Sequence, residues 1–138
     1  MARVLLPKGK LSVTIGIDLV EVAKVEKVFG KNEALQEAVF TQGEIRYSKR
    51  RQRPVVHLAE RFAAKEAFFK ALGTGLSGEA DWRDVEVEEG IPGRPTLRLR
   101  GETARMGSDQ GIIGCAVSLS HTRAYALALV LLVRRDSS

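Results

Sequence analysis

The sequence has few of the residues that build common metal and covalent sites. Cys115 is the only cysteine, so no internal disulfide can form, and two histidines leave too few ligands for a structural zinc site. The HExxH, CxxC and GxSxG signatures are absent. Cys115 lies in an apolar run, where a packed thiol is favoured over a nucleophile. This cysteine usage fits a reducing compartment, and we expect the protein in the cytoplasm.

Long apolar runs are also missing. No segment reaches the roughly 20 apolar residues that a membrane span needs. The N-terminal MARVLLPKGK has basic residues but too short an apolar run for a signal peptide. We therefore expect a soluble protein without a membrane contact.

The length and the net charge of the chain limit the number of domains and the kinds of partner that we expect. The 138 residues, of which 44% are hydrophobic, can bury one core, so we expect a single α+β domain. Lys and Arg number 22 against 17 Asp and Glu, which gives a formal net charge of +5 and a pI near 9.7. This surplus favours anionic partners, namely nucleic acid, phosphorylated metabolites or acidic proteins.

Residues 57–76, HLAERFAAKEAFFKALGTGL, have the pattern of one long helix that ends at Gly73. Pro54 suits the first turn of this helix. Bulky side chains share one arc and alanines line the opposite side, so we expect the helix to be packed on most sides. The bulky arc consists of Leu58, Phe62, Phe68, Phe69 and Leu72, and the small side of Ala59, Ala63, Ala64, Ala67 and Ala71.

Four charges on this apolar helix are candidates for function. Arg61 and Lys65 are like charges one turn apart inside the bulky arc, so we expect something anionic to offset them. Glu66 lies at the edge of that arc, one turn before Lys70. A helix ion pair worth about 0.2–0.5 kcal/mol would also account for Glu66 and Lys70. The concentration of charge on so apolar a helix favours the functional interpretation.

A second candidate carboxylate is Asp18. Residues 12–18 alternate, with Val13, Ile15 and Ile17 on one face and Asp18 with small residues on the other, so Asp18 ends a predicted strand. The helical pattern of residues 19–29 follows, and Asp18 with Glu21 would make a capping box. A carboxylate at a strand end that faces small residues is equally well placed to hold a metal ion.

Between the helical patterns at 19–29 and 57–76, the sequence predicts two short helices and a basic loop. The helices are expected at residues 31–39 and from a Thr41/Glu44 capping box through Ser48. The basic run that follows, Lys49 to Arg53, is either a solvated face or a contact for phosphate or an acidic protein.

The C-terminal half predicts a hairpin and a pair of long strands. Residues 82–88 and 96–100 alternate around a Gly/Pro turn, and residues 101–109 can form a short helix. The apolar runs 112–120 and 125–133 are expected to be central antiparallel strands that bury both faces. His121 lies between them, where a histidine can cap a turn or serve a ligand.

Asp18 and Glu66, with basic neighbours, are the carboxylates that remain for chemistry. Oxygen ligands of this kind suit Mg²⁺, which takes one or two protein carboxylates together with substrate phosphates and water. The residues alone therefore indicate metal-assisted chemistry on a phosphate ester.

Three blocks of the sequence resemble the short holo-[acyl-carrier-protein] synthases in order and spacing. They are GIDLVEVAKVEKVF at 16–29, RFAAKEAFFKALGTGL at 61–76 and SLSHTRAYALALV at 118–130. The resemblance implies transfer of 4′-phosphopantetheine from coenzyme A to a serine of an apo acyl carrier protein. It also implies the 4′-phosphopantetheinyl transferase fold, with an antiparallel sheet packed against a long central helix, over residues 12–134 after an N-terminal extension, 1–11.

The resemblance assigns roles residue by residue. Asp18 and Glu66 would bind Mg²⁺ with the coenzyme A pyrophosphate, and Glu66 and Lys70 would be catalytic. Coenzyme A is expected to contact Arg61, Lys65, Lys70, Gly73, His121 and Thr122, with His121 and Thr122 at its 3′-phosphate.

The resemblance also implies partners. The carrier protein would dock on the basic first helix at Lys24 and Lys27, and Lys24 replaces the family's usual arginine, which loses the bidentate fork. Gly43 stands where a larger polar residue is typical. Relatives of this kind serve fatty acid biosynthesis as homotrimers with active sites between subunits. The alternative is a basic nucleic-acid-binding domain without catalysis, which lacks aromatics interleaved with its basic residues.

Overall fold

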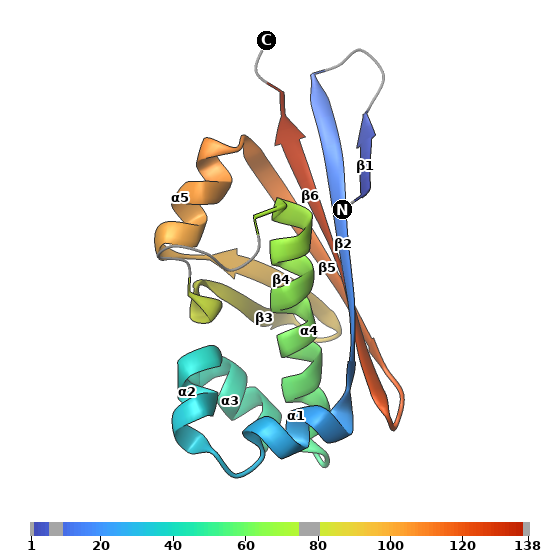
Figure 1. The fold of residues 1–138 in the computed structure, drawn as a ribbon, viewed down its shortest axis with the longest axis vertical. Helices are drawn as coiled ribbons and strands as arrows, with labels where there is room; N and C mark the ends of the chain where they lie inside the picture. The colour runs from blue at the N-terminus through green and yellow to red at the C-terminus, as the bar shows by residue number, and fades with distance from the viewer. Residues whose placement is uncertain (1, 6–9, 75–80, 137–138) are drawn as a thin grey trace.

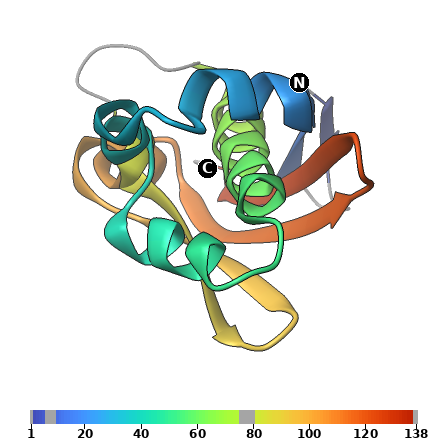
Figure 2. The same cartoon turned by 90° about the horizontal axis from the view of Figure 1, so that it is seen from below.

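The structure is a computed structural model that describes residues 2–5, 10–74 and 81–136. A single long helix, α4 (Pro54–Leu72), lies against one face of an antiparallel sheet (Figure 1). Seen from below, the sheet and the shorter helices are arranged around α4 (Figure 2). This α+β architecture is the one predicted from the sequence.

The sheet has the strand order β1-β2-β6-β5. Its centre is the pair β2 (Leu11–Glu21) and β6 (Tyr125–Arg135), which are in register over the whole length of both strands. Strand β5 (Ile112–His121) pairs with β6, and β1 (Ala2–Leu5) pairs with β2. The predicted N-terminal extension thus adds a strand to the sheet of the domain.

Close packing of β2 on α4 depends on small residues on both elements. The α4 residues Ala63, Ala64, Ala67 and Ala71 are fully buried. A Cβ atom at Gly16 of β2 would lie only 1.9 Å from the Ala67 carbonyl oxygen. Glycine therefore lets the strand backbone approach the helix backbone directly, which brings the neighbouring side chain of Asp18 against α4.

Strand β2 buries its polar face and exposes its apolar face, which is the reverse of an ordinary sheet strand. The polar set predicted from alternation, which includes Thr14 and Asp18, is buried toward α4. The apolar set points away from α4, where Ile17 is 54% exposed. Strand β2 also runs past Asp18 to Glu21, which precedes helix α1 (Val22–Phe29) without a side-chain cap. The predicted strand end and the Asp18/Glu21 capping box are both wrong, because pairing with β6 extends the strand.

Three short helices cover one end of α4. Helix α1 is followed by α2 (Glu33–Val39) and α3 (Gln42–Lys49), and the predicted capping box of Thr41 and Glu44 is present at the start of α3. Their apolar side chains form a core with α4 that includes Val25, Phe29, Val39, Phe40, Ile45, Val56 and Leu58.

The remaining elements complete the domain. A 3₁₀ turn (Trp82–Asp84) precedes the predicted hairpin, whose strands are β3 (Val85–Ile91) and β4 (Arg94–Leu99). The predicted strand therefore begins at Val85, three residues later than expected. Helix α5 (Gly101–Asp109) lies where the sequence predicted it.

The prediction that residues 112–120 and 125–133 form central strands with two buried faces is wrong in part. Strand β5 is an edge of the described sheet. The outer face of β6 is open in a single chain, where Leu129 is 37% exposed. Within the described ranges, no helix is both long enough and apolar enough to cross a membrane.

Candidate active site

Helix α4 provides most of the candidate site. It begins with Pro54 in its first turn and ends at Gly73, which has a φ of 87° and caps the helix in the left-handed conformation. Nineteen residues at 1.5 Å each give a rod of roughly 28 Å. The charged residues of α4 are thus held at fixed positions along a buried, rigid element.

Asp18 and Lys70 meet where β2 crosses α4. The Lys70 Nζ donates to Asp18 Oδ1 at 2.6 Å and lies 3.3 Å from the Ile17 carbonyl oxygen. The Asp18 side chain is 8% exposed, whereas that of Lys70 is 54% exposed. Asp18 Oδ2 is buried and has no hydrogen-bond partner among the described residues. A buried carboxylate oxygen without a partner is costly unless a ligand or ion satisfies it.

Glu66 completes this group. Burial raises the pKa of Glu66 above its ordinary value of 4.5, and the negative charge of Asp18 raises it further, while Lys70 opposes both effects. A carboxylate whose ionisation is disfavoured by burial and by a second carboxylate marks a place where a cation would be stabilised. The structure therefore brings together Asp18, Glu66 and Lys70, the three residues to which the resemblance assigns the metal ion and the pyrophosphate.

Lys65, by contrast, is inside the protein. Its side chain is fully buried, and its Nζ lies 2.8 Å from Glu44 Oε1, 2.6 Å from the Val85 carbonyl oxygen and 3.1 Å from that of Trp82. Burial lowers the pKa of Lys65, although Glu44 favours the charged form. The anion expected from the sequence to offset the charge of Lys65 is thus Glu44 of α3. The prediction that Lys65 contacts coenzyme A disagrees with this placement, because its three N–H bonds already have partners.

The Glu44 carboxylate also fixes the backbone around it. Its Oε1 accepts the Thr41 N–H and its Oε2 accepts the Val87 N–H, both at 2.9 Å. One buried ion pair therefore ties together α3, α4 and β3.

Arg61 and His121 lie together with Glu60, a residue that the sequence analysis did not single out. His121 Nδ1 lies 3.1 Å from Glu60 Oε2, and Arg61 Nη1 lies 3.7 Å from Glu60 Oε1. The same Oε1 is 3.1 Å from Nδ1 of His57. His121 thus binds a carboxylate instead of capping the β5–β6 turn. Thr122 has the capping role, since its Oγ1 accepts the N–H of Ala124 and of Tyr125.

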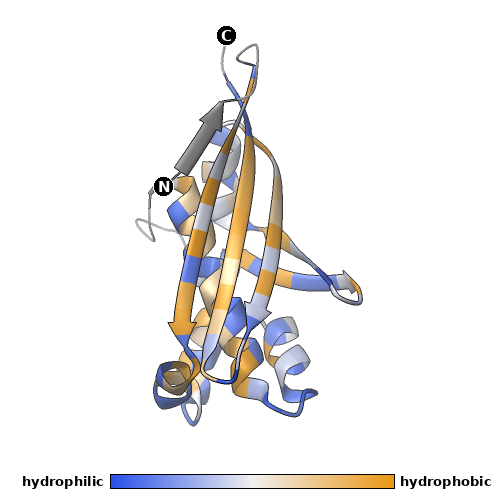
Figure 3. Cartoon of the chain, turned by 90° about the vertical axis from the view of Figure 1, so that its right-hand side faces the viewer, coloured by the Kyte–Doolittle hydropathy of each residue, from blue (hydrophilic) through white to orange (hydrophobic). Residues whose placement is uncertain are grey.

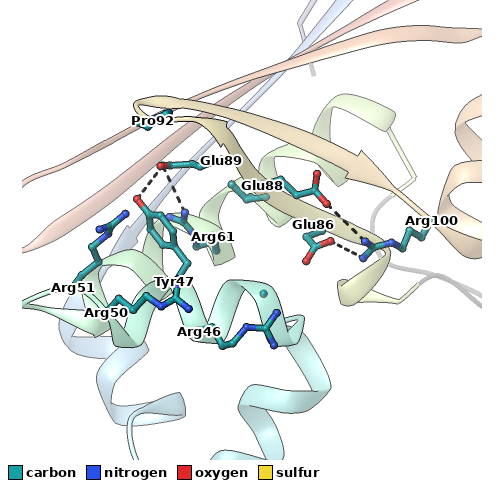
Figure 4. Close-up of a pocket in the computed structure, with 12 residues that line it drawn as sticks. Arg46, Tyr47, Arg50, Arg51, Arg61, Glu86, Glu88, Glu89, Pro92 and Arg100 are labelled. Atoms are coloured by element: carbon teal, nitrogen blue, oxygen red, sulfur yellow. Dashed lines mark hydrogen bonds and ion pairs between the residues drawn. The ribbon is translucent and has the colours of Figure 1, made fainter.

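Arg61 forms one wall of a basic pocket of about 640 Å³ (Figure 4). The Arg61 guanidinium stacks on the Tyr47 ring at 3.9 Å, and Arg51 stacks on the same ring at 4.1 Å. Glu89 of β3 accepts the Tyr47 hydroxyl at 3.0 Å and lies 3.8 Å from Arg61. Arg46, Arg50, Arg51 and Arg100 also line the pocket. The basic run before α4 therefore contributes to a pocket as well as to a solvated face.

The floor of this pocket explains the unusual glycine in α3. A Cβ atom at Gly43 would lie 3.1 Å from Glu86 Oε2. Glu86 in turn pairs with Arg100 at 2.6 Å and accepts the Thr41 hydroxyl. The small residue leaves room for this carboxylate beside the arginines.

The other predicted contacts lie at the surface. Gly73 is exposed at the end of α4. Gly75, in the same sequence block at 61–76, lies outside the described residues. The Lys24 side chain is 77% exposed and lies 3.9 Å from Glu21, and Lys27 is exposed on the same helix. Lys24 also lines an apolar pocket of about 420 Å³ between α1 and the end of the sheet.

The predicted residues form two groups. Glu60 and Glu66 are six residues apart on α4, which places them roughly 120° apart around its axis. Asp18, Glu66 and Lys70 lie where α4 packs on β2, whereas Arg61 lines the pocket beside α3 and β3 and is linked to His121 through Glu60. Within the described ranges, no hydrogen bond or ion pair joins the two groups.

Sequence reasoning missed Tyr47, His57, Glu60 and Glu89. The only available signal was the spacing of His57 and Glu60, three residues apart on a helix that is otherwise apolar there.

Comparison with known proteins places this geometry in a family. The model of the 4′-phosphopantetheinyl transferase superfamily matches residues 14–130. The chain belongs to this superfamily. The match includes Asp18, all of α4 and His121, so the resemblance drawn from the sequence is confirmed.

Relatives within the superfamily agree with this assignment. The holo-[acyl-carrier-protein] synthase of Geobacter sp. strain M21 is 42% identical over 120 residues, which cover 86% of this chain and 96% of that protein. The structure of the Chronobacterium ammoniagenes ACPS-CoA complex is similar with a TM-score of 0.79 and 33% identity, covering 91% of this chain and 98% of the other. The Neisseria meningitidis synthase gives a TM-score of 0.78 with 31% identity, covering 86% and 96%.

Proposed function

We propose that this chain transfers the 4′-phosphopantetheine group of coenzyme A to a serine of an apo acyl carrier protein and releases 3′,5′-ADP. The observation that supports it most is the group Asp18, Glu66 and Lys70, which lies within the superfamily match and joins two carboxylates to an exposed ammonium. The relatives named above are holo-[acyl-carrier-protein] synthases, and one similar structure is a complex with coenzyme A.

The residues fit a magnesium ion. Asp18 Oδ2 is buried and has no hydrogen-bond partner among the described residues, and burial and Asp18 raise the pKa of Glu66 beside it, so a cation would stabilise both carboxylates. Two carboxylates are too few for an all-protein cage, which suits an ion that also binds substrate phosphates. When bound, Mg²⁺ would neutralise charge on the pyrophosphate during transfer.

Lys70 and Glu66 have distinct roles in this proposal. Lys70 holds Asp18 in place through Oδ1, and its exposed ammonium is free to contact the pyrophosphate that becomes part of the leaving group. Glu66 is the carboxylate that we assign to accept the proton of the attacking serine, because it lies beside Asp18 and Lys70, where the pyrophosphate would bind.

The basic pocket suits the nucleotide end of coenzyme A. Arg61, Arg51 and Arg46 bring positive charge to one concave surface, and Glu60 links Arg61 of this surface to His121. A 3′-phosphate is a dianion that such a set of donors would bind. Thr122, at the turn beside His121, remains a proposed contact through its exposed position.

The two groups lie roughly 120° apart around the axis of α4, so one substrate has to reach two sides of the helix. Active sites between subunits would resolve this separation. The outer face of the sheet supports such an assembly, because its strands are largely hydrophobic in composition (Figure 3) and several of their apolar side chains are exposed. Ile17, Leu19 and Leu129 are 54%, 60% and 37% exposed on this face. We propose a homotrimer that buries it.

Helix α1 is the proposed docking surface for the carrier protein. Lys24 and Lys27 are exposed beside an apolar pocket lined by Leu19, Val28 and Tyr125. An acidic helical surface with a few apolar side chains would match both features. A cytoplasmic carrier protein of fatty acid biosynthesis is the partner we propose.

Mass spectrometry of an apo carrier protein tests the proposal. Incubation with the enzyme, coenzyme A and Mg²⁺ should add the mass of one phosphopantetheine, and a carrier in which the acceptor serine is replaced by alanine should gain none. Retention on DNA compared with retention on immobilised coenzyme A tests the nucleic-acid alternative. Salt-sensitive binding to DNA without any mass gain would reject the transferase assignment.

A further inference from the structure

Glu60 is a buried carboxylate that lies between the chain's two histidines. It is 6% exposed, and each of its oxygens lies 3.1 Å from a histidine Nδ1, Oε1 from that of His57 and Oε2 from that of His121. The two imidazole rings meet edge to face with their centroids 5.8 Å apart. His57 and His121 are the only histidines in the sequence. Every histidine of the chain is therefore oriented by the same carboxylate.

The chemistry of a carboxylate fixes the proton on each ring. An ionised carboxylate can only accept hydrogen bonds, so both Nδ1 atoms must donate to it. Each ring then turns its Nε2 away from Glu60. Burial lowers the pKa of His57, so that ring is the neutral Nδ1–H tautomer near neutral pH.

Only one of the rings is open to a ligand. The His121 side chain is 43% exposed, compared with 19% for His57. His57 packs against Tyr47, whose ring also supports Arg61. His57 is thus a packed neighbour within this cluster, and His121 is the ring that can meet an incoming group.

We propose that Glu60 is a positioning residue, which holds His121 with Nδ1 protonated and Nε2 directed at the 3′-phosphate of coenzyme A. This inference rests on the proposed function. The ring then lies between two hydrogen-bond acceptors, with Glu60 at Nδ1 and the phosphate at Nε2. Glu60 also lies 3.7 Å from Arg61 Nη1, so the same carboxylate orients a second donor of the pocket.

The helix position of Glu60 supports this role. A carboxylate placed on α4 solely for solubility would face water, yet Glu60 is buried among three cationic or ionisable partners. Second-layer carboxylates that orient histidine commonly fix its tautomer in this way.

Nitrogen-15 NMR of histidine-labelled protein reads the tautomers directly. Both rings of the wild type should show a protonated Nδ1, and a His57→Gln variant assigns the two spin systems. The amide of Glu60→Gln offers a single acceptor oxygen, so at least one ring should lose the Nδ1–H form. Glu89→Gln is the matched control, because it removes a neighbouring carboxylate that contacts Arg61 and Tyr47 but neither histidine. Unchanged tautomers in Glu60→Gln would overturn the inference.

Substrate discrimination tests the functional consequence. The ratio of kcat/KM for coenzyme A to that for 3′-dephospho-coenzyme A should fall on the order of tenfold in Glu60→Gln, mainly through KM for coenzyme A. The variant's kcat/KM for the dephosphorylated substrate should fall much less. Glu60→Gln that loses thermal stability but keeps the wild-type ratio would show a purely structural role and overturn the inference.

The role of Glu60 and the transferase assignment can be contradicted by different results. A wild-type enzyme that modifies the carrier but does not distinguish the two substrates would overturn the role of Glu60 and leave the transferase assignment intact. A wild type that modifies no carrier at all would overturn the transferase assignment itself, and the inference with it.

Discussion

Replacing Lys65 with methionine separates a structural lysine from a ligand-binding one. Methionine keeps most of the volume of the side chain but removes the ammonium, which contacts Glu44 at 2.8 Å and two backbone carbonyl oxygens at 2.6 and 3.1 Å. Both charged side chains are fully buried. The variant would leave the Glu44 carboxylate with two backbone N–H donors and no countercharge.

The expected cost follows from this burial. Removing one partner of a buried ion pair typically destabilises a protein by about 3–5 kcal/mol. That is a large part of the roughly 5–15 kcal/mol by which a domain is stable. A surface pair would lose only about 0–1 kcal/mol. Lys24→Met is the surface control and should lose much less, because the side chains of Lys24 and of its partner Glu21 are 77% and 47% exposed.

Urea denaturation at a fixed protomer concentration measures the effect, since assembly would make stability depend on concentration. A double-mutant cycle with Glu44→Gln should show coupling of about 1–3 kcal/mol between the two positions. A loss below about 1 kcal/mol for Lys65→Met would refute the buried-pair argument. Normal stability with weakened coenzyme A binding would restore the role that the sequence predicted for Lys65.

Three further changes test the proposed site. Asp18→Ala should abolish phosphopantetheine transfer in a folded protein, and near-normal turnover at ordinary Mg²⁺ would reject the carboxylate pair. Glu66 has a raised folded-state pKa, so in metal-free protein it contributes stability below pH 4.5 that is lost as pH rises through the folded pKa. Glu66→Gln should flatten this slope in denaturation across pH, and an unaltered slope would contradict the shift. Lys24→Glu should raise KM for the carrier protein far more than KM for coenzyme A, and equal rises would remove Lys24 from the docking surface.

Local periodicity was sufficient to place each residue of the Asp18 group on its own element. The period of two along β2 placed Asp18 with Thr14 and Gly16 on one face, and the period of 3.6 along α4 placed Glu66 one turn before Lys70. The two periodicities depend on neighbours in the sequence, so one chain was enough to infer them. The resemblance to the holo-[acyl-carrier-protein] synthases then implied that Asp18 and Glu66 share one metal site.

Partners that come from distant elements could not be predicted in this way. The sequence required an anion near Arg61 and Lys65, but a substrate phosphate and a glutamate of another helix satisfy that requirement equally well. Glu44 precedes Lys65 by 21 residues and reaches it only through the packing of α3 on α4. The predicted end of β2 was wrong for the same reason. Pairing with β6, a distant strand, determines where β2 ends, and local capping residues do not.

The buried ion pair explains how one helix can serve two different parts of the reaction. Glu44 and Lys65 lock α3 and β3 onto α4, and those elements contribute Tyr47 and Glu89 to the basic pocket. The opposite side of α4 is free to pack on the small residues of β2, where Asp18 is held. The charged residues of α4 therefore have different surroundings. Lys65 forms a buried ion pair, Arg61 lines the basic pocket, and Lys70 lies beside Asp18. Because the basic pocket and the Asp18 group lie on different sides of the same rigid helix, we propose that a second copy of the chain joins them on one substrate.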